Sequence, residues 1–112
     1  MKIAKRVIIS GRVQGVFFRA NTKQKAEQLG ITGWVRNTSD GKVEAIFEGD
    51  ENSVKEMISW CRHGPSLARV DNINIKENKA TSEYTDFKIK YYYFICLVFT
   101  KRFNIIYILL II

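Results

Sequence analysis

Hydrophobic and polar positions follow two different spacings in the first part of the chain. The β-branched run at residues 7–9, between polar neighbours, predicts a strand over residues 5–10. Apolar or small side chains then recur at helical intervals, which predicts an amphipathic helix over residues 18–29: Phe18, Thr22, Ala26 and Leu29. The chain therefore opens as a strand, a glycine-containing loop and a helix.

A β-hairpin is predicted next. Residues 32–37 form its first strand, with Trp34 as the large apolar side chain. Asp40-Gly41 is typical of a tight hairpin turn. Residues 43–48 form the returning strand, which Gly49-Asp50 is expected to close.

The third section contains a second helix and two further strands. Ser53 and Glu56 have the spacing of a capping box. The apolar positions that follow recur at i, i+3, i+4 and i+7: Val54, Met57, Ile58 and Cys61. Gly64-Pro65 ends this helix, and strands are predicted over residues 68–76 and 87–90.

The order of these elements is βαββαβ. It predicts an α+β, ferredoxin-like sandwich in which two helices cover one face of an antiparallel sheet. We expect residues 1–91 to form this domain and residues 92–112 to form an apolar C-terminal tail.

The tail differs in composition from the rest of the chain. Two apolar runs, at residues 91–99 and 105–112, flank Thr100-Lys101-Arg102. Each run is shorter than the roughly 18 residues expected of a spanning helix, and no helical periodicity separates a polar face from an apolar one. We therefore expect no stable membrane insertion, with a surface anchor as the alternative, and an aggregation-prone segment if the tail is exposed.

Composition and charge narrow the class of protein. The chain has 112 residues, enough for one modest core, and a formal charge of +7 that favours anionic ligands without selecting one. Cys61 and Cys96 lack the spacing of a metal site. Residues 1–10 lack the apolar core of a signal peptide, so a cytoplasmic protein is expected.

Candidate chemistry lies between the first strand and the first helix. Glycines flank this loop, so its backbone can approach an anion closely, and the helix N-terminus adds free N–H groups. Arg19 brings a planar set of donors suited to phosphate or carboxylate. On loop chemistry alone, a tight turn followed by a surface arginine is an equal alternative.

Two blocks of sequence carry a resemblance to a known family. Gly11-Arg12-Val13-Gln14-Gly15-Val16-Phe17-Phe18-Arg19 looks like one signature of the acylphosphatases, and Gly33-Trp34-Val35-Arg36-Asn37-Thr38-Ser39-Asp40-Gly41-Lys42-Val43-Glu44 resembles the other. The likeness covers residues 2–91, and the tail departs from it. It implies a small enzyme that hydrolyses an acyl phosphate to a carboxylate and inorganic phosphate, without metal or other cofactor.

By position in the resemblance, the phosphate-binding arginine is Arg19 and the water-orienting asparagine is Asn37. The phosphate loop comprises Gly11, Arg12, Val13, Gln14, Gly15, Val16 and Phe17. A carboxylate leaving group needs no strong general acid, so placement and charge stabilisation suffice. The amide of Asn37 is a poor base and is expected to orient the water.

The neighbouring polar residues are expected to have lesser roles. Arg36 lies on the opposite strand face from Asn37 and is interpreted as solvated. Arg12 is also interpreted as solvated, while Gln14 is expected to buttress the loop. His63, the single histidine, is interpreted as structural.

Two other functions remain open from the sequence. A basic βαββαβ domain can bind single-stranded RNA through aromatic residues on its central strands, but the first strand here is aliphatic, so no nucleic-acid partner is expected. A regulatory domain within a larger assembly is the other possibility, and the short chain argues for a stand-alone monomer instead.

Overall fold

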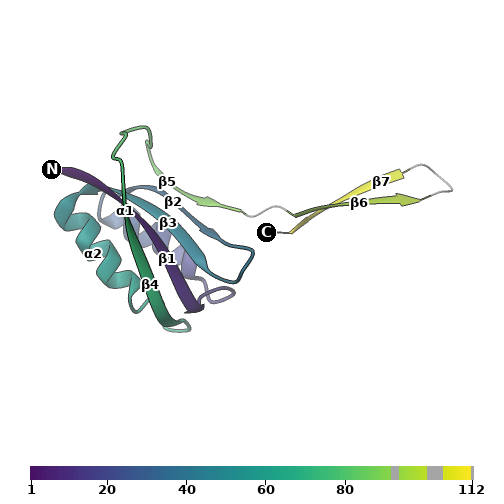
Figure 1. Ribbon diagram of the computed structural model, residues 1–112, viewed down its shortest axis with the longest axis horizontal. Helices are drawn as coiled ribbons and strands as arrows, with labels where there is room; N and C mark the ends of the chain where they lie inside the picture. The colour runs from purple at the N-terminus through teal and green to yellow at the C-terminus, as the bar shows by residue number, and fades with distance from the viewer. Residues whose placement is uncertain (92–93, 101–104, 112) are drawn as a thin grey trace.

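The computed structural model describes residues 1–91, 94–100 and 105–111. Figure 1 shows a sheet-and-helix sandwich followed by a separate hairpin. The elements of the sandwich are β1 (Lys2–Arg12), α1 (Phe18–Gln28), β2 (Thr32–Asn37), β3 (Val43–Asp50), α2 (Glu51–Cys61), β4 (Arg69–Asn78) and β5 (Phe87–Lys90). The hairpin consists of β6 (Phe94–Thr100) and β7 (Ile105–Ile111).

The five strands of the sandwich form one sheet in the order β4-β1-β3-β2-β5. The ferredoxin-like prediction is confirmed, but the sheet is mixed rather than wholly antiparallel, because β5 pairs in parallel with β2. Strand β4 runs antiparallel to β1. The chain leaves β4 at the end of the sheet where β2 begins, so the next strand must run in the same direction as β2.

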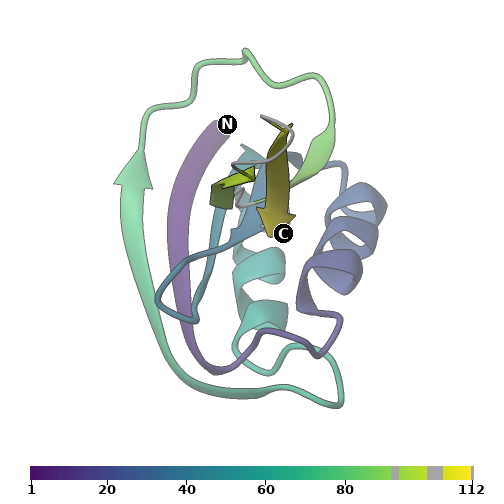
Figure 2. The same cartoon turned by 90° about the vertical axis from the view of Figure 1, so that its right-hand side faces the viewer.

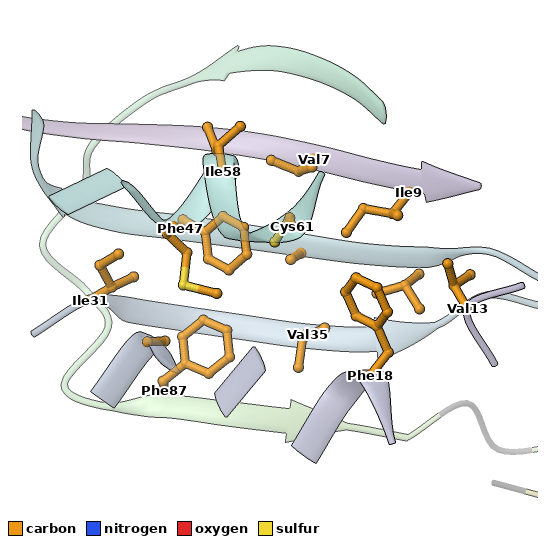
Figure 3. Packing of buried hydrophobic residues seen from close by; sticks show 14 of the residues in the cluster. Val7, Ile9, Val13, Phe18, Ile31, Val35, Phe47, Ile58, Cys61 and Phe87 are labelled. Atoms are coloured by element: carbon orange, nitrogen blue, oxygen red, sulfur yellow. The ribbon is translucent and has the colours of Figure 1, made fainter. Parts of the chain in front are cut away.

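Both helices cover the same face of the sheet (Figures 1 and 2). Helix α1 packs on β2 and β5, and α2 packs on β1 and β3. Figure 3 shows the core between the layers, where the rings of Phe47 and Phe87 stack with centroids 5.8 Å apart. Burying side chains of this size contributes about 2 kcal/mol each, so this layer holds the sheet to the helices.

The start of α2 differs from its prediction. Asp50 is the N-cap, and its side chain accepts a hydrogen bond from the backbone N–H of Asn52 at 3.2 Å. The capping box expected at Ser53 and Glu56 is therefore wrong, because the helix begins at Glu51, two residues before Ser53. Gly49 and Asp50 do not merely close the strand: they pair with Ile3 and Lys2 of β1 as part of β3.

Strands β6 and β7 pair antiparallel in a two-stranded sheet of their own. The side chains of residues 92–112, on which the expectations of a surface anchor and an aggregation-prone segment depend, lie outside the described residues. Within the described part of the chain, each helix is too short or too polar to span a bilayer.

Candidate functional site

The loop between β1 and α1 has an unusual backbone. Gly15 has φ = 73°, and Phe17, the N-cap of α1, has φ = 63° and makes no capping hydrogen bond with its side chain. A positive φ is rare for an aromatic residue. Left-handed residues in a turn can direct successive N–H groups into one concavity, which suits an anion. The first N–H groups of α1 add to it, since they have no acceptor within the helix.

Phe18 fixes the start of α1 in the core. Its ring is buried and meets the ring of Trp60 edge-on, with centroids 5.7 Å apart. Gly64 packs so closely that a Cβ there would lie 2.5 Å from the Phe18 ring. Arg19 follows Phe18 directly, so this packing determines where the first turn presents its guanidinium.

The sheet register places Asn37 on the helix-covered face. Asn37 pairs with Val43 of β3, and Val43 pairs on its other side with Ile9 of β1. Val43 and Ile9 both belong to the hydrophobic core. Residues directly opposite in an antiparallel pair share a face. Strands β1, β2 and β5 all run toward the end of the sheet where α1 begins, so Asn37, the last residue of β2, meets Arg19 there.

Gln14 links the loop to the β2–β3 turn. Its side-chain Nε2 donates hydrogen bonds to the backbone oxygens of Thr38 at 2.8 Å and Lys42 at 2.9 Å. The turn is closed further by the hydroxyl of Thr38, which accepts from the N–H of Lys42 at 3.0 Å. Gln14 thus connects the loop to the residue after Asn37, which is the buttressing that the sequence predicts.

A pocket of about 280 Å³ lies where these elements meet. The residues that line it are Val13, Gly15, Phe17, Phe18, Arg19, Ala20, Asn37, Ile89 and Tyr91. The guanidinium of Arg19 lies over the ring of Tyr91, 5.4 Å from its centroid. These lining residues, all in the described part of the chain, include neither a carboxylate nor an imidazole.

Two polar atoms of this pocket lack a hydrogen-bond partner. They are Nη1 of Arg19 and Oδ1 of Asn37, both buried within the described residues. Buried polar groups without partners are uncommon and require an explanation. One atom is a cationic donor and the other an amide acceptor, so together they suit an anion and a water molecule.

The predicted loop residues do not all reach the pocket. Val13, Gly15 and Phe17 line it, whereas Val16 is buried in the core. Gly11 and Arg12 belong to β1 and pair with β4. A Cβ at Gly11 would lie 2.2 Å from the backbone oxygen of Arg69, so this glycine permits close strand approach, and Arg12 is exposed as expected.

The opposite face of the sheet holds a different cluster. Arg6 and Arg36 both bond to the carboxylate of Glu44, with Nε of Arg36 donating at 2.6 Å. Arg36 lies on the face opposite Asn37 as expected, but it is only partly solvated, because the buried carboxylate of Glu44 holds it. Burial raises the pKa of Glu44, but the hydrogen bonds from the two arginines outweigh burial, so the pKa lies below its ordinary value.

Within the described residues, no group of three or more His, Cys, Asp or Glu side chains is arranged to hold a metal ion. Burial raises the pKa of the Cys61 thiol, which keeps it protonated and unreactive in the core. His63, interpreted as structural, has an exposed side chain, and its backbone N–H bonds to the carbonyl of Trp60 at 3.1 Å.

Comparison with known proteins identifies the family and the fold. The sequence model described as Acylphosphatase matches residues 5–89. The chain belongs to the acylphosphatase family. An acylphosphatase of Methylococcus capsulatus is 51% identical over 83 residues, which cover 74% of this chain and 90% of that one.

Solved acylphosphatase structures have the same architecture. The acylphosphatase from Coxiella burnetii matches with a TM-score of 0.76 and 40% identity, over 80% of this chain and 93% of that one. The one from Bacillus subtilis matches with a TM-score of 0.76 and 34% identity, over 81% of this chain and all of that one. The residues that the sequence model matches, 5–89, lie within the sandwich.

Sequence reasoning missed two contributors to the acylphosphatase pocket. Ile89 and Tyr91 line it from β5 and the residue after it. For Ile89 the signal is the alternation of residues 87–90, which places it on the same side of the strand as Phe87. That alternation becomes informative only once β5 is known to pair with β2, and the pairing is a tertiary contact.

Proposed function

We infer that the chain hydrolyses acyl phosphates to a carboxylate and inorganic phosphate in the pocket between β2 and α1. The observation that carries this proposal is the pair of unpartnered buried atoms, Nη1 of Arg19 and Oδ1 of Asn37, in one pocket. Family membership supplies the reaction class, and the two atoms suggest how this chain performs it.

In this proposal Arg19 binds the phosphoryl group. Its guanidinium donates charge-assisted hydrogen bonds to the phosphoryl oxygens, and the N–H groups of the loop and of the first turn of α1 surround the remaining charge. The positive φ values at Gly15 and Phe17 support this role, because left-handed residues in a turn can direct successive N–H groups toward one anion.

Asn37 orients the attacking water. Its free Oδ1 accepts a hydrogen bond from the water, which leaves an oxygen lone pair directed at phosphorus. An amide is too weak a base to take the proton, so a phosphoryl oxygen of the substrate receives it. The P–O bond to the acyl group breaks, and the carboxylate leaves with the bonding electrons.

The leaving group explains why the pocket can work without an acid. A carboxylate is stable as it departs, so the proposed reaction requires neither a proton donor nor a Lewis acid. The main contributions are then placement of the water and stabilisation of the charge on phosphorus.

The test is release of inorganic phosphate from acetyl phosphate by the purified full chain in the presence of EDTA. We expect saturable turnover, with inorganic phosphate as a competitive product inhibitor. The matched control is Arg36→Ala, which removes an arginine next to Asn37 but on the opposite face of the sheet. Turnover that requires an added metal, or that Arg36→Ala abolishes, contradicts the proposal.

We also propose that the protein has no nucleic-acid partner. On the open face of the sheet, the central strands carry Arg6, Ile46 and Glu44 rather than aromatic residues. Trp34 on β2 and Tyr84 line the same pocket as these residues, and Nζ of Lys90 lies 4.6 Å from the Trp34 ring centroid. Steeply salt-dependent binding of single-stranded RNA in a gel-shift assay would contradict this expectation.

A further inference from the structure

Phe17 occupies a position that disfavours an aromatic residue for two separate reasons. Its backbone is left-handed, with φ = 63°, a conformation that is strained for a bulky side chain. It is also the N-cap of α1, where Ser, Thr, Asp or Asn would supply a hydrogen bond that the phenyl ring cannot. An asparagine would tolerate the left-handed backbone more readily than a phenylalanine does.

Burial in the hydrophobic core does not offset the strain at Phe17, because the ring is not buried there. The Phe17 side chain is 70% exposed, whereas the next residue, Phe18, is 2% exposed. Adjacent phenylalanines thus have opposite environments: Phe18 anchors the helix, and Phe17 faces solvent. A contribution to folding does not explain an exposed ring on a strained backbone.

Phe17 borders the pocket that contains Arg19 and Asn37. Tyr91 and Ile89 line the same pocket, and Tyr91 is 43% exposed. The pocket therefore combines two parts: a polar part formed by the guanidinium and the amide, and an apolar, partly exposed part formed by Phe17, Tyr91 and Ile89.

This combination matches the two halves of an acyl phosphate. The phosphoryl group is a dianion and requires the polar part, which leaves the acyl group to extend toward the exposed apolar side chains. A flat or apolar acyl group would cover the Phe17 ring and be removed from water, whereas an acetyl group is too small to cover much of it.

We propose that Phe17, together with Tyr91, forms a binding site for the acyl group and makes this enzyme selective for acyl phosphates with aromatic or extended apolar acyl groups. This inference rests on the proposed function, since it assigns the substrate class of the same pocket.

The test compares benzoyl phosphate with acetyl phosphate as substrates of the full chain. In Phe17→Asn, which suits the left-handed N-cap but lacks the ring, we expect the ratio of kcat/KM for benzoyl over acetyl phosphate to fall roughly 5- to 10-fold. The change should arise mainly in KM for benzoyl phosphate. Phe17→Tyr keeps the ring and should keep the wild-type ratio.

Leu67→Asn is the control for loss of an exposed apolar side chain. Leu67 is 60% exposed and does not line the pocket, so its replacement should leave the ratio at the wild-type value. If Phe17→Asn lowers kcat/KM for both substrates by the same factor, Phe17 serves only the loop conformation and the inference is overturned. An unchanged ratio in Phe17→Asn overturns it as well.

A binding measurement separates this inference from the proposed function. Phenylphosphonate and methylphosphonate are not hydrolysed, and calorimetry can compare their affinities for wild type and Phe17→Asn. If no acyl phosphate is turned over but phenylphosphonate still binds more tightly than methylphosphonate in a Phe17-dependent manner, the proposed function fails and the apolar site stands. If acyl phosphates are hydrolysed and the two phosphonates bind equally well, the proposed function stands and the apolar site is overturned.

Discussion

Arg19 and Arg36 lie near Asn37 on opposite faces of the sheet and have similar surroundings with one difference. Each guanidinium lies over an aromatic ring, Arg19 at 5.4 Å from the Tyr91 centroid and Arg36 at 5.7 Å from the Trp34 centroid. Arg36 also pairs with the buried carboxylate of Glu44. The pocket of Arg19 has no carboxylate among its lining residues, and Nη1 of Arg19 lacks a partner.

The comparison shows how one residue type serves two purposes. Glu44 accepts hydrogen bonds from both Arg36 and Arg6, so these guanidiniums are already bonded to a carboxylate and link β1, β2 and β3 of the sheet. An arginine left without such a partner costs about 1–3 kcal/mol of desolvation in the free protein, which in the proposed function the bound phosphoryl dianion offsets.

Arg19→Ala should cause the largest loss. Removing the unpartnered guanidinium should lower kcat/KM for acetyl phosphate by roughly 10³-fold and weaken inhibition by inorganic phosphate. Arg36→Ala should change kcat/KM by no more than roughly twofold. Steady-state phosphate release measures both, and equal losses in the two variants would mean that the faces are not functionally distinct.

Asn37→Ala should slow the chemical step without removing the anion site. We expect kcat to fall roughly 10²-fold, because the water is no longer oriented, with little change in the inhibition constant of inorganic phosphate. Asn74, an exposed amide on β4, supplies the control variant Asn74→Ala. A large rise in the inhibition constant with kcat unchanged would assign Asn37 to phosphate binding instead.

Glu44→Ala should affect stability and largely spare activity. The substitution leaves the guanidiniums of Arg6 and Arg36 without the carboxylate that pairs with both. Both arginines are about half exposed, so solvent screens part of the repulsion between them. We therefore expect the free energy of unfolding to fall by about 2 kcal/mol. Urea denaturation measures this loss. A variant that is equally stable but inactive would show that Glu44 belongs to the catalytic site.

Gln14→Ala should have a moderate effect on catalysis. Losing its bonds to the carbonyls of Thr38 and Lys42 frees the loop from the turn after Asn37, and a misplaced water should lower kcat roughly 10-fold. Gln14→Glu is a useful companion, since a carboxylate cannot donate to these carbonyls and should not restore kcat. Full activity in Gln14→Ala would show that the link is dispensable.

The smallest effect concerns pH. The pKa of Glu44 in the folded protein lies below its ordinary value of 4.5, so the ion-paired form stabilises the fold above that pH. The stabilisation is lost as pH falls through the folded pKa, with a slope of at most about 1.4 kcal/mol per pH unit. Urea denaturation between about pH 5 and about pH 3 should therefore show a shallower pH dependence for Glu44→Gln than for wild type.

Local patterns predicted most of the fold. Thr32–Asn37 and Phe87–Lys90 have the strand bounds expected from alternation, and α1 begins at Phe18 as expected. One error depends on a strand partner far along the chain, and the other on a local helix cap. Strand β1 extends to Lys2 because Lys2 pairs with Asp50, and α2 begins at Glu51 because Asp50, rather than Ser53, caps it.

The residues available to the pocket could be named before folding was known: loop chemistry points to the glycine loop and Arg19, and the resemblance to the acylphosphatases points to Asn37. Only the tertiary structure decided which charges remain without partners. The register of β2 on β3 brings Glu44 to Arg36, and the parallel pairing of β5 with β2 brings Ile89 to the pocket and Tyr91 beside Arg19. The reason is physical: whether a buried polar atom has a partner depends on side chains brought close by folding, which their spacing along the chain does not reveal.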